Sequence, residues 1–252
     1  MNITLDLAWL EAVMLAAVRL TGFIIIAPPF SYKAFPGRIK AMIAIGLALA
    51  VSARVAPGYE SLDTGHLIGS LIMEFSVGAT LGFMVFLTFA AIQSAGNLID
   101  MSSGFQMAQG FDPQAQINGA QFTKLFQMTA LMLLFTTDGY QIIIAGIIRS
   151  FDSLPVGAAL SMPVTAELLI RGLTGMFVSA VQIAGPIMVV LFLADAGLGL
   201  LNRVAPALNA FALGFPLKVL ITLALAGTVF LALPRVVSVL VQTAANQLMG
   251  VR

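Results

Sequence analysis

The side chains that most often carry out chemistry in proteins are scarce and widely spaced in this sequence. Its 252 residues include a single histidine, His66, and no cysteine. One imidazole cannot make a paired-histidine zinc motif, and a chain without cysteine cannot build a thiolate zinc site or an iron–sulfur cluster. His66 ends the segment GYESLDTGH, after Glu60 and Asp63, where a solvated loop histidine is favoured over a metal ligand.

Motifs for nucleotide binding and covalent catalysis are also missing. The sequence has no GxxxxGK[ST] loop and no GxGxxG after a strand-like run. A Ser–His–Asp triad would have to use His66, and no GxSxG surrounds a serine. A Ser–Lys dyad using Lys124 or Lys218 stays open, although no motif points to one. We therefore expect no enzyme activity, no cofactor and no metal site.

Four charged residues lie in or beside apolar segments: Arg19, Glu74, Asp138 and Asp195. A charge in lipid costs on the order of a few kcal/mol, so each of these should face protein or water. They could line an ion or proton pathway, or they could pair between helices or subunits. Because they are scattered along the chain, pairing is the favoured interpretation.

The composition is that of an integral membrane protein. Hydrophobic residues make up 60% of the chain and charged residues 9%, against roughly 25% charged residues in soluble domains. The formal net charge is +1, and the chain has no basic cluster that would neutralise the phosphates of a nucleic acid. The lipid bilayer is the expected surrounding, and nucleic acid is not an expected partner.

Six apolar segments predict an all-α fold, at about residues 7–27, 39–56, 67–95, 124–148, 167–194 and 216–233. The third would measure ~43 Å as a helix, more than a hydrocarbon core of ~30 Å, so it must tilt, bend or project from the bilayer. Gly78 and Gly82 within it have the GxxxG spacing that lets two helix backbones approach closely.

Prolines and a polar turn predict where these segments break. Pro28-Pro29 should end the first segment, and Thr136-Thr137-Asp138-Gly139 should interrupt the fourth. A kink at Gly185-Pro186 should split the fifth, and Pro234-Arg235 should end the sixth.

Residues 102–123, SSGFQMAQGFDPQAQINGAQFT, form a long break that is rich in glutamine. Asp112 is the only charge in this segment. Connectors that simply face water usually carry more charge, so the composition favours a segment that is buried in protein or lines an aqueous path. An ordinary solvated loop is the alternative.

Two stretches carry a resemblance to a known family. They are residues 104–113, GFQMAQGFDP, and residues 197–218, GLGLLNRVAPALNAFALGFPLK. They resemble the FliR family of flagellar biosynthetic proteins, whose counterparts in virulence secretion are the SctT-type export proteins. The resemblance extends over essentially the whole chain and includes DGY at residues 138–140 and DSLPVG at residues 152–157.

This resemblance implies a fold of kinked helical hairpins. Residues 1–171, including a plug loop at 102–123, would resemble FliP, and residues 173–248 would form a FliQ-like helical hairpin. It also implies that the chain is a non-enzymatic core subunit of the type III export gate. That gate lies in the bacterial inner membrane within the flagellar basal body, with much of the assembled complex on the periplasmic side. The implied partners are several copies each of FliP and FliQ, then FlhB and FlhA, and the unfolded flagellar proteins that are exported.

The resemblance also assigns residues. The candidates that would occlude the pore are Phe105, Met107, Phe111 and Ile117, and the glycines that would act as joints of the loop are Gly104, Gly110 and Gly119. The candidates for subunit contact or structural roles are Asn202, Arg203, Asn209 and Lys218.

Two other functions compete with an export gate: an autonomous small-solute transporter and a membrane enzyme. Transporters more often show two matching halves with interrupted helices in corresponding positions. The predicted breaks at residues 138–139 and 185–186 fall in no such register, and the enzyme lacks a catalytic constellation.

Overall fold

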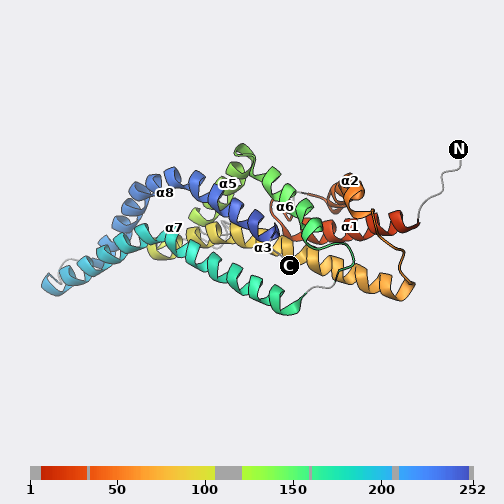
Figure 1. Ribbon diagram of the computed structural model, residues 1–252. Helices are drawn as coiled ribbons and strands as arrows, with labels where there is room; N and C mark the ends of the chain where they lie inside the picture. Colours follow the sequence, from red (N-terminus) through yellow and green to blue (C-terminus); the bar gives the residue numbers. More distant parts are fainter. Residues whose placement is uncertain (1–6, 33–34, 106–120, 159–160, 206–209, 250–252) are drawn as a thin grey trace. The chain divides into compact units, whose positions relative to one another are not determined.

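The computed structural model describes residues 7–32, 35–105, 121–158, 161–205 and 210–249, and its regular structure there is entirely helical (Figure 1). The predicted all-α class is confirmed. In chain order the helices are α1 (Leu7–Ile26), α2 (Gly37–Val55), α3 (Thr64–Ser103), α5 (Gln121–Thr136), α6 (Gly139–Ser153), α7 (Met162–Val204) and α8 (Ala210–Met249).

Four helices in the described part of the chain are long and apolar enough to cross a bilayer. They are α1, α3, α7 and the stretch Leu213–Leu248 of α8, and the broken pair of α5 and α6 would make a fifth span. Helix α2 is outside this set; it carries Arg38, Lys40 and Arg54 within 19 residues. The protein is therefore an integral membrane protein, as the composition predicts.

The predicted end of the sixth segment is wrong, because Pro234 lies inside α8. Pro186 likewise lies inside α7, so the helix is not divided there, and a kink at Gly185-Pro186 within it stays a prediction. A proline removes one backbone donor, but neighbouring helices and local adjustments satisfy the freed groups in apolar helices. As a result α7 runs for 43 residues and α8 for 40.

The predicted interruption of the fourth segment is confirmed. Helix α5 ends at Thr136 and α6 begins at Gly139. Between them, Asp138 has a φ of 54°, in the left-handed region that Asp enters more readily than most residues.

The chain forms two compact units. The first contains the residues up to Thr88, Asp138–Leu173 and the residues from Val239 onward, and the second contains Phe89–Thr137 and Thr174–Ser238. Because the boundaries fall within α3, α7 and α8, each of these helices contributes to both units.

In the first unit, α1 and α3 touch backbone to backbone through glycines. A Cβ atom on Gly78 would lie 1.9 Å from the Arg19 carbonyl oxygen, and one on Gly82 would lie 2.8 Å from the Phe23 carbonyl oxygen. Gly22 of α1 is equally confined, with the Phe75 carbonyl oxygen 2.6 Å from its ideal Cβ position. The close approach predicted from the GxxxG spacing is confirmed.

The contact between α1 and α3 predicts a sharp cost for one methyl group. We expect Gly78→Ala to destabilise the protein by about 3 kcal/mol or more, because the methyl group meets backbone that cannot rotate away. Gly69 of the same helix is exposed and has nothing within 4 Å of an added Cβ. Gly69→Ala should therefore be neutral or slightly stabilising. Thermal unfolding of the purified variants in detergent checks this, and equal midpoints would contradict it.

Candidate functional site

The base of the glutamine-rich segment is a junction between the end of α3 and the start of α5, both in the second unit. Residues 106–120 lie outside the described residues, so the structure describes this segment at its two ends. Gly104 follows the last residue of α3 with a φ of 85°, a conformation that glycine adopts without steric cost. At the other end, Gln121 is the first residue of α5.

Asp100 joins the two helices at this base. Its side chain is fully buried, and its Oδ1 accepts a hydrogen bond from the Phe122 backbone N–H at 3.0 Å. Its Oδ2 accepts from the Thr123 backbone N–H at 2.8 Å and from the Thr123 hydroxyl at 2.9 Å. The first N–H groups of a helix have no partner within it, and a negative charge is favourable there. Asp100 therefore caps α5 from a distant helix.

Gly96 makes this cap geometrically possible. It lies one helical turn before Asp100, and a Cβ at Gly96 would lie 2.7 Å from the Thr123 Cα and 2.8 Å from the Phe122 carbonyl oxygen. Only a residue without a side chain allows α3 to approach α5 this closely. We call Gly96, Asp100, Phe122 and Thr123 together the α3–α5 clasp.

A series of aromatic rings extends from the clasp. The ring centroids of Phe105 and Phe122 are 5.6 Å apart, those of Phe122 and Phe126 are 6.1 Å apart, and those of Phe126 and Phe230 are 5.5 Å apart. All three pairs meet edge to face, the arrangement favoured by the ring quadrupoles. The series ties the residue that enters the glutamine-rich segment to the core of the second unit.

The structure places some of the predicted plug residues and not others. Phe105 is half-buried against Phe122, and Gly104 has the positive φ expected of a joint. The predicted residues outside the described part of the chain are Met107, Gly110, Phe111, Ile117 and Gly119. Their roles stay predictions.

The predicted contact residues near the C-terminal half divide in the same way. Asn202 and Arg203 are exposed in the last turn of α7, and Asn209 lies outside the described residues. The Lys218 Nζ lies 2.7 Å from the Asp195 Oδ1, in an ion pair that joins α8 to α7 within the second unit. Lys218 thus has a structural partner within its own chain.

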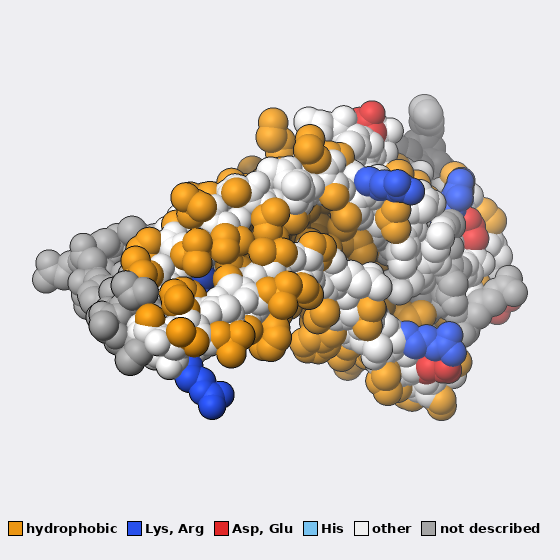
Figure 2. Space-filling model, turned by 90° about the vertical axis from the view of Figure 1, so that its left-hand side faces the viewer, with side chains coloured by type: hydrophobic (Ala, Val, Ile, Leu, Met, Phe, Trp, Pro, Cys, Tyr) orange, Lys and Arg blue, Asp and Glu red, His pale blue; other side chains and the backbone are white. Residues whose placement is uncertain are grey.

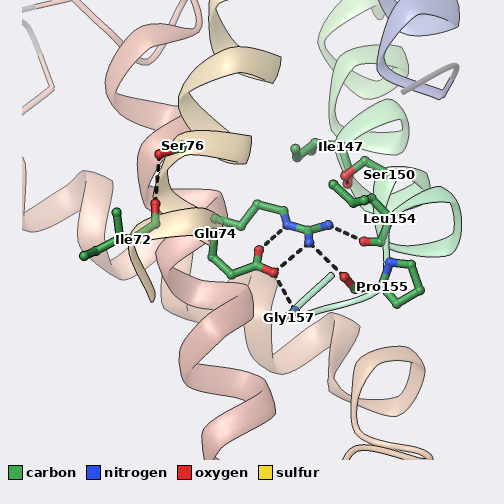
Figure 3. A network of polar contacts seen from close by, with 9 residues as sticks. Ile72, Glu74, Ser76, Ile147, Ser150, Leu154, Pro155 and Gly157 are labelled. Atoms are coloured by element: carbon green, nitrogen blue, oxygen red, sulfur yellow. Dashed lines mark hydrogen bonds and ion pairs between the residues drawn. The ribbon is translucent and has the colours of Figure 1, made fainter. Parts of the chain in front are cut away.

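Two buried charges of the first unit, Arg19 and Glu74, form a second network (Figure 3). Arg19 and Glu74 are 0% and 1% exposed and form a two-pronged ion pair, in which the Arg19 Nη2 donates to the Glu74 Oε1 at 2.9 Å. The Arg19 Nη1 also donates to the Leu154 carbonyl at 2.8 Å, and the Gly157 N–H donates to the Glu74 Oε1 at 2.8 Å. The guanidinium carbon lies 4.4 Å from the centroid of the Phe151 ring.

This network joins α1 and α3 to the connector between α6 and α7. Gly157 has a φ of 80°, and its N–H is aimed at the carboxylate, so the DSLPVG segment is shaped around the ion pair. The interpretation that charges pair between helices is confirmed for Arg19, Glu74 and Asp195. The remaining residue, Asp138, is exposed and accepts a hydrogen bond from the Gln141 side chain at 3.3 Å.

Glu11 is a further buried carboxylate, which fixes the loop between α2 and α3. It accepts hydrogen bonds from the Leu62 N–H at 3.1 Å and from the Tyr59 hydroxyl at 3.5 Å. Burial raises the pKa of Tyr59 above 10.0, and the negative charge of Glu11 raises it further. The phenol therefore stays protonated and able to donate at physiological pH.

Sequence reasoning missed Asp100, although a signal existed. It is an acidic residue near the end of a long apolar segment, and it precedes the start of the next helix by about twenty residues. Such a carboxylate needs donors, and the free N–H groups of a nearby helix start are the available ones.

The ion pair of the first unit predicts strong non-additivity. Arg19→Met or Glu74→Gln alone should destabilise the protein by about 3–5 kcal/mol, because each leaves its partner buried and unpaired. The double variant should lose clearly less than the sum of the two single variants. The pair of Glu167 and Arg171 on α7 is a control, since its side chains are 62% and 77% exposed and Glu167→Gln should cost at most about 0.5 kcal/mol. Thermal unfolding of the purified protein provides the measurement, and additive losses would contradict the prediction.

Comparisons with known proteins identify the family of this chain. Residues 10–244 match the family described as bacterial export proteins, family 1. The flagellar biosynthetic protein FliR of Pectobacterium carotovorum subsp. carotovorum is 32% identical over 231 residues, which cover 90% of this chain and 87% of that protein. The FliR protein of Bacillus subtilis (strain 168) is 27% identical over 256 residues, with 98% of both chains covered.

A relative from a differently named group also matches. The surface presentation of antigens protein SpaR of Shigella sonnei is 27% identical over 225 residues and covers 86% of each chain. The resemblance of residues 104–113 and 197–218 to the FliR family is thus confirmed along nearly the full length of the chain. This membrane protein belongs to the bacterial export proteins, family 1.

Proposed function

We propose that this chain is a non-enzymatic core subunit of a flagellar type III protein export gate in the bacterial inner membrane. In this proposal it assembles with several copies of FliP and FliQ into a helical channel within the basal body. FlhB and FlhA are further partners, and unfolded flagellar proteins pass through the channel. The family match over residues 10–244 and the relatives named as flagellar biosynthetic proteins support this assignment.

The observation that carries the proposal is the length of apolar helix that this chain leaves uncovered. In α7 and in α8, only 22% of the most apolar 18-residue stretch is buried. The corresponding buried share is 56% in α1 and 61% in α3. Hydrophobic side chains dominate the face shown in Figure 2, and charged ones are few. On α7 alone, Ile170, Phe177, Phe192 and Leu200 are each more than 60% exposed.

Lipid cannot cover this surface along its whole length. At 1.5 Å per residue, helices of 43 and 40 residues measure about 60–65 Å, twice a hydrocarbon core of ~30 Å. Exposed apolar residues occur from Met162 to Val204 along α7, so part of this surface needs protein partners. This requirement supports an assembly that projects from the bilayer, on the periplasmic side in our proposal, and disfavours an autonomous transporter.

The proposed division of labour follows the order of the chain. Residues 1–171 would take a position like that of FliP, and residues 173–248 would act as a FliQ-like hairpin. The pair of Asp195 and Lys218, which joins α7 to α8 within the second unit, supports the hairpin. Asn202, Arg203 and Asn209 would then contact neighbouring subunits.

We further propose that the glutamine-rich segment helps to plug the closed channel. Its single charge, Asp112, and its glycine joints suit a polar lumen, and Met107 is our first candidate for the side chain that seals it. Phe105, Phe111 and Ile117 are the other candidates. The α3–α5 clasp supports this role, because it provides a firm base from which a plug could extend.

The assembly proposal predicts the behaviour of the purified protein. When produced together with FliP and FliQ, the chain should appear in native mass spectrometry in one complex with several copies of each. When produced alone, its helices α7 and α8 should be poorly ordered, because their apolar faces then lack partners. A stable, monodisperse monomer without bound partners would contradict the export-gate assignment.

The plug proposal predicts a leak. Deleting residues 106–119 keeps Gly104, Phe105 and the clasp, so the complex should still assemble. Cells or proteoliposomes that contain the shortened protein should pass small ions that the unaltered complex retains. An unchanged ion permeability, with the complex intact, would show the plug assignment to be wrong.

A further inference from the structure

We propose that Asp100 is the positioning residue of the glutamine-rich segment: it holds together the two points where the segment enters and leaves, and thereby keeps the closed channel tight. This inference rests on the proposed plug function of the segment. It assigns to one described side chain the task of fixing the base of the segment.

The first argument is the cost of placing a carboxylate at this position. Asp100 is 0% exposed, and among the described residues its oxygens accept from two backbone N–H groups and one hydroxyl, which belong to Phe122 and Thr123. A buried charge is costly unless hydrogen bonds compensate for it, and hydrogen bonds to an ionised acceptor are the stronger kind. An apolar residue would pack at this point of α3 without that cost. The carboxylate is therefore explained by the start of α5 and not by the packing of α3.

The second argument is where these bonds lie along the chain. Gly104, where the chain leaves α3, is one helical turn beyond Asp100, and Phe122 is the second residue of α5. One side chain thus reaches from the exit of one helix to the entry of the next. The glutamine-rich segment runs between two points whose separation Asp100 fixes.

The third argument is that the residues around Asp100 are closely packed. An added Cβ at Gly96 would meet the Thr123 backbone at 2.7 Å, and Phe105 packs on Phe122 with ring centroids 5.6 Å apart. The clasp is therefore close-packed on both sides of its hydrogen bonds. The Asp100 hydrogen bonds therefore depend on one spacing of the two helix ends, and a change at Asp100 acts directly on that spacing.

The test uses two pairs of matched variants in the complex with FliP and FliQ. Asp100→Asn keeps the shape of the side chain but removes its charge and one acceptor, so one donor of α5 loses its partner. Asp138→Asn makes the same change at an exposed position and is its control. Thr123→Val removes only the hydroxyl bond to Asp100, whereas Thr123→Ser retains it.

Three measurements are made on each complex: its stoichiometry by native mass spectrometry, its ion permeability in proteoliposomes, and the hydrogen exchange of the peptide that contains Phe122 and Thr123. We expect Asp100→Asn to assemble normally and to leak toward the level of the deletion of residues 106–119. Exchange of the two amides should be about tenfold faster, as loss of a charge-assisted bond would produce. Thr123→Val should leak less, and Asp138→Asn and Thr123→Ser should be as tight as the unaltered complex.

The outcomes separate this inference from the plug proposal. If the deletion of residues 106–119 stays tight, the plug assignment fails, and the inference fails with it. If the deletion leaks but an assembled Asp100→Asn complex stays tight, the plug assignment stands and the role of Asp100 is overturned. If Asp100→Asn does not assemble, the Thr123 pair decides: a leak with valine but not with serine supports the role, and two tight complexes overturn it.

A double variant excludes a general loss of stability. Asp100→Asn combined with the deletion should leak no more than the deletion alone, because the clasp then has no segment to position. A leak that increases beyond that of the deletion would show that Asp100 acts elsewhere in the fold, and would overturn the inference.

Discussion

Polar groups that are buried among apolar helices have to be satisfied by the protein itself, and the described structure is organised around that constraint. Arg19 and Glu74 share two hydrogen bonds, and each makes a further hydrogen bond to the backbone of the segment between α6 and α7. Asp100 uses its oxygens on the start of α5. In each case the groups that satisfy a charge belong to a different segment, so that neutralising the charge also fixes the position of that segment.

The same device appears at two places on α3. Glu74 and Gly78 are one helical turn apart, and so are Gly96 and Asp100. At each place the glycine lets another backbone come within contact distance, and the carboxylate hydrogen-bonds to what lies there. The glycine alone would give a close but unspecific contact, since apolar surfaces in lipid are held mainly by packing. The carboxylate makes the contact specific, because its donors must be at fixed positions.

Sequence reasoning succeeded where a signal was local. The apolar segments, the GxxxG approach at Gly78 and Gly82 and the break at Asp138 depend on neighbouring residues, and the structure has all of them. It failed at Pro234, because the rule that proline ends helices is weakened where neighbouring helices satisfy the freed backbone. It could not find the α3–α5 clasp, since the partners of Asp100 are 22 and 23 residues away. Which donor satisfies a buried acid depends on tertiary structure.

The great length of α7 and α8 has a consequence for the life of this protein in the cell. A newly made chain carries apolar helix that extends well past the hydrocarbon layer, and such surface promotes aggregation and proteolysis before assembly. In the proposed export gate, an excess of this chain over its partners would therefore be degraded or would precipitate. The length of the two helices would then make the useful amount of this subunit depend on the supply of those partners.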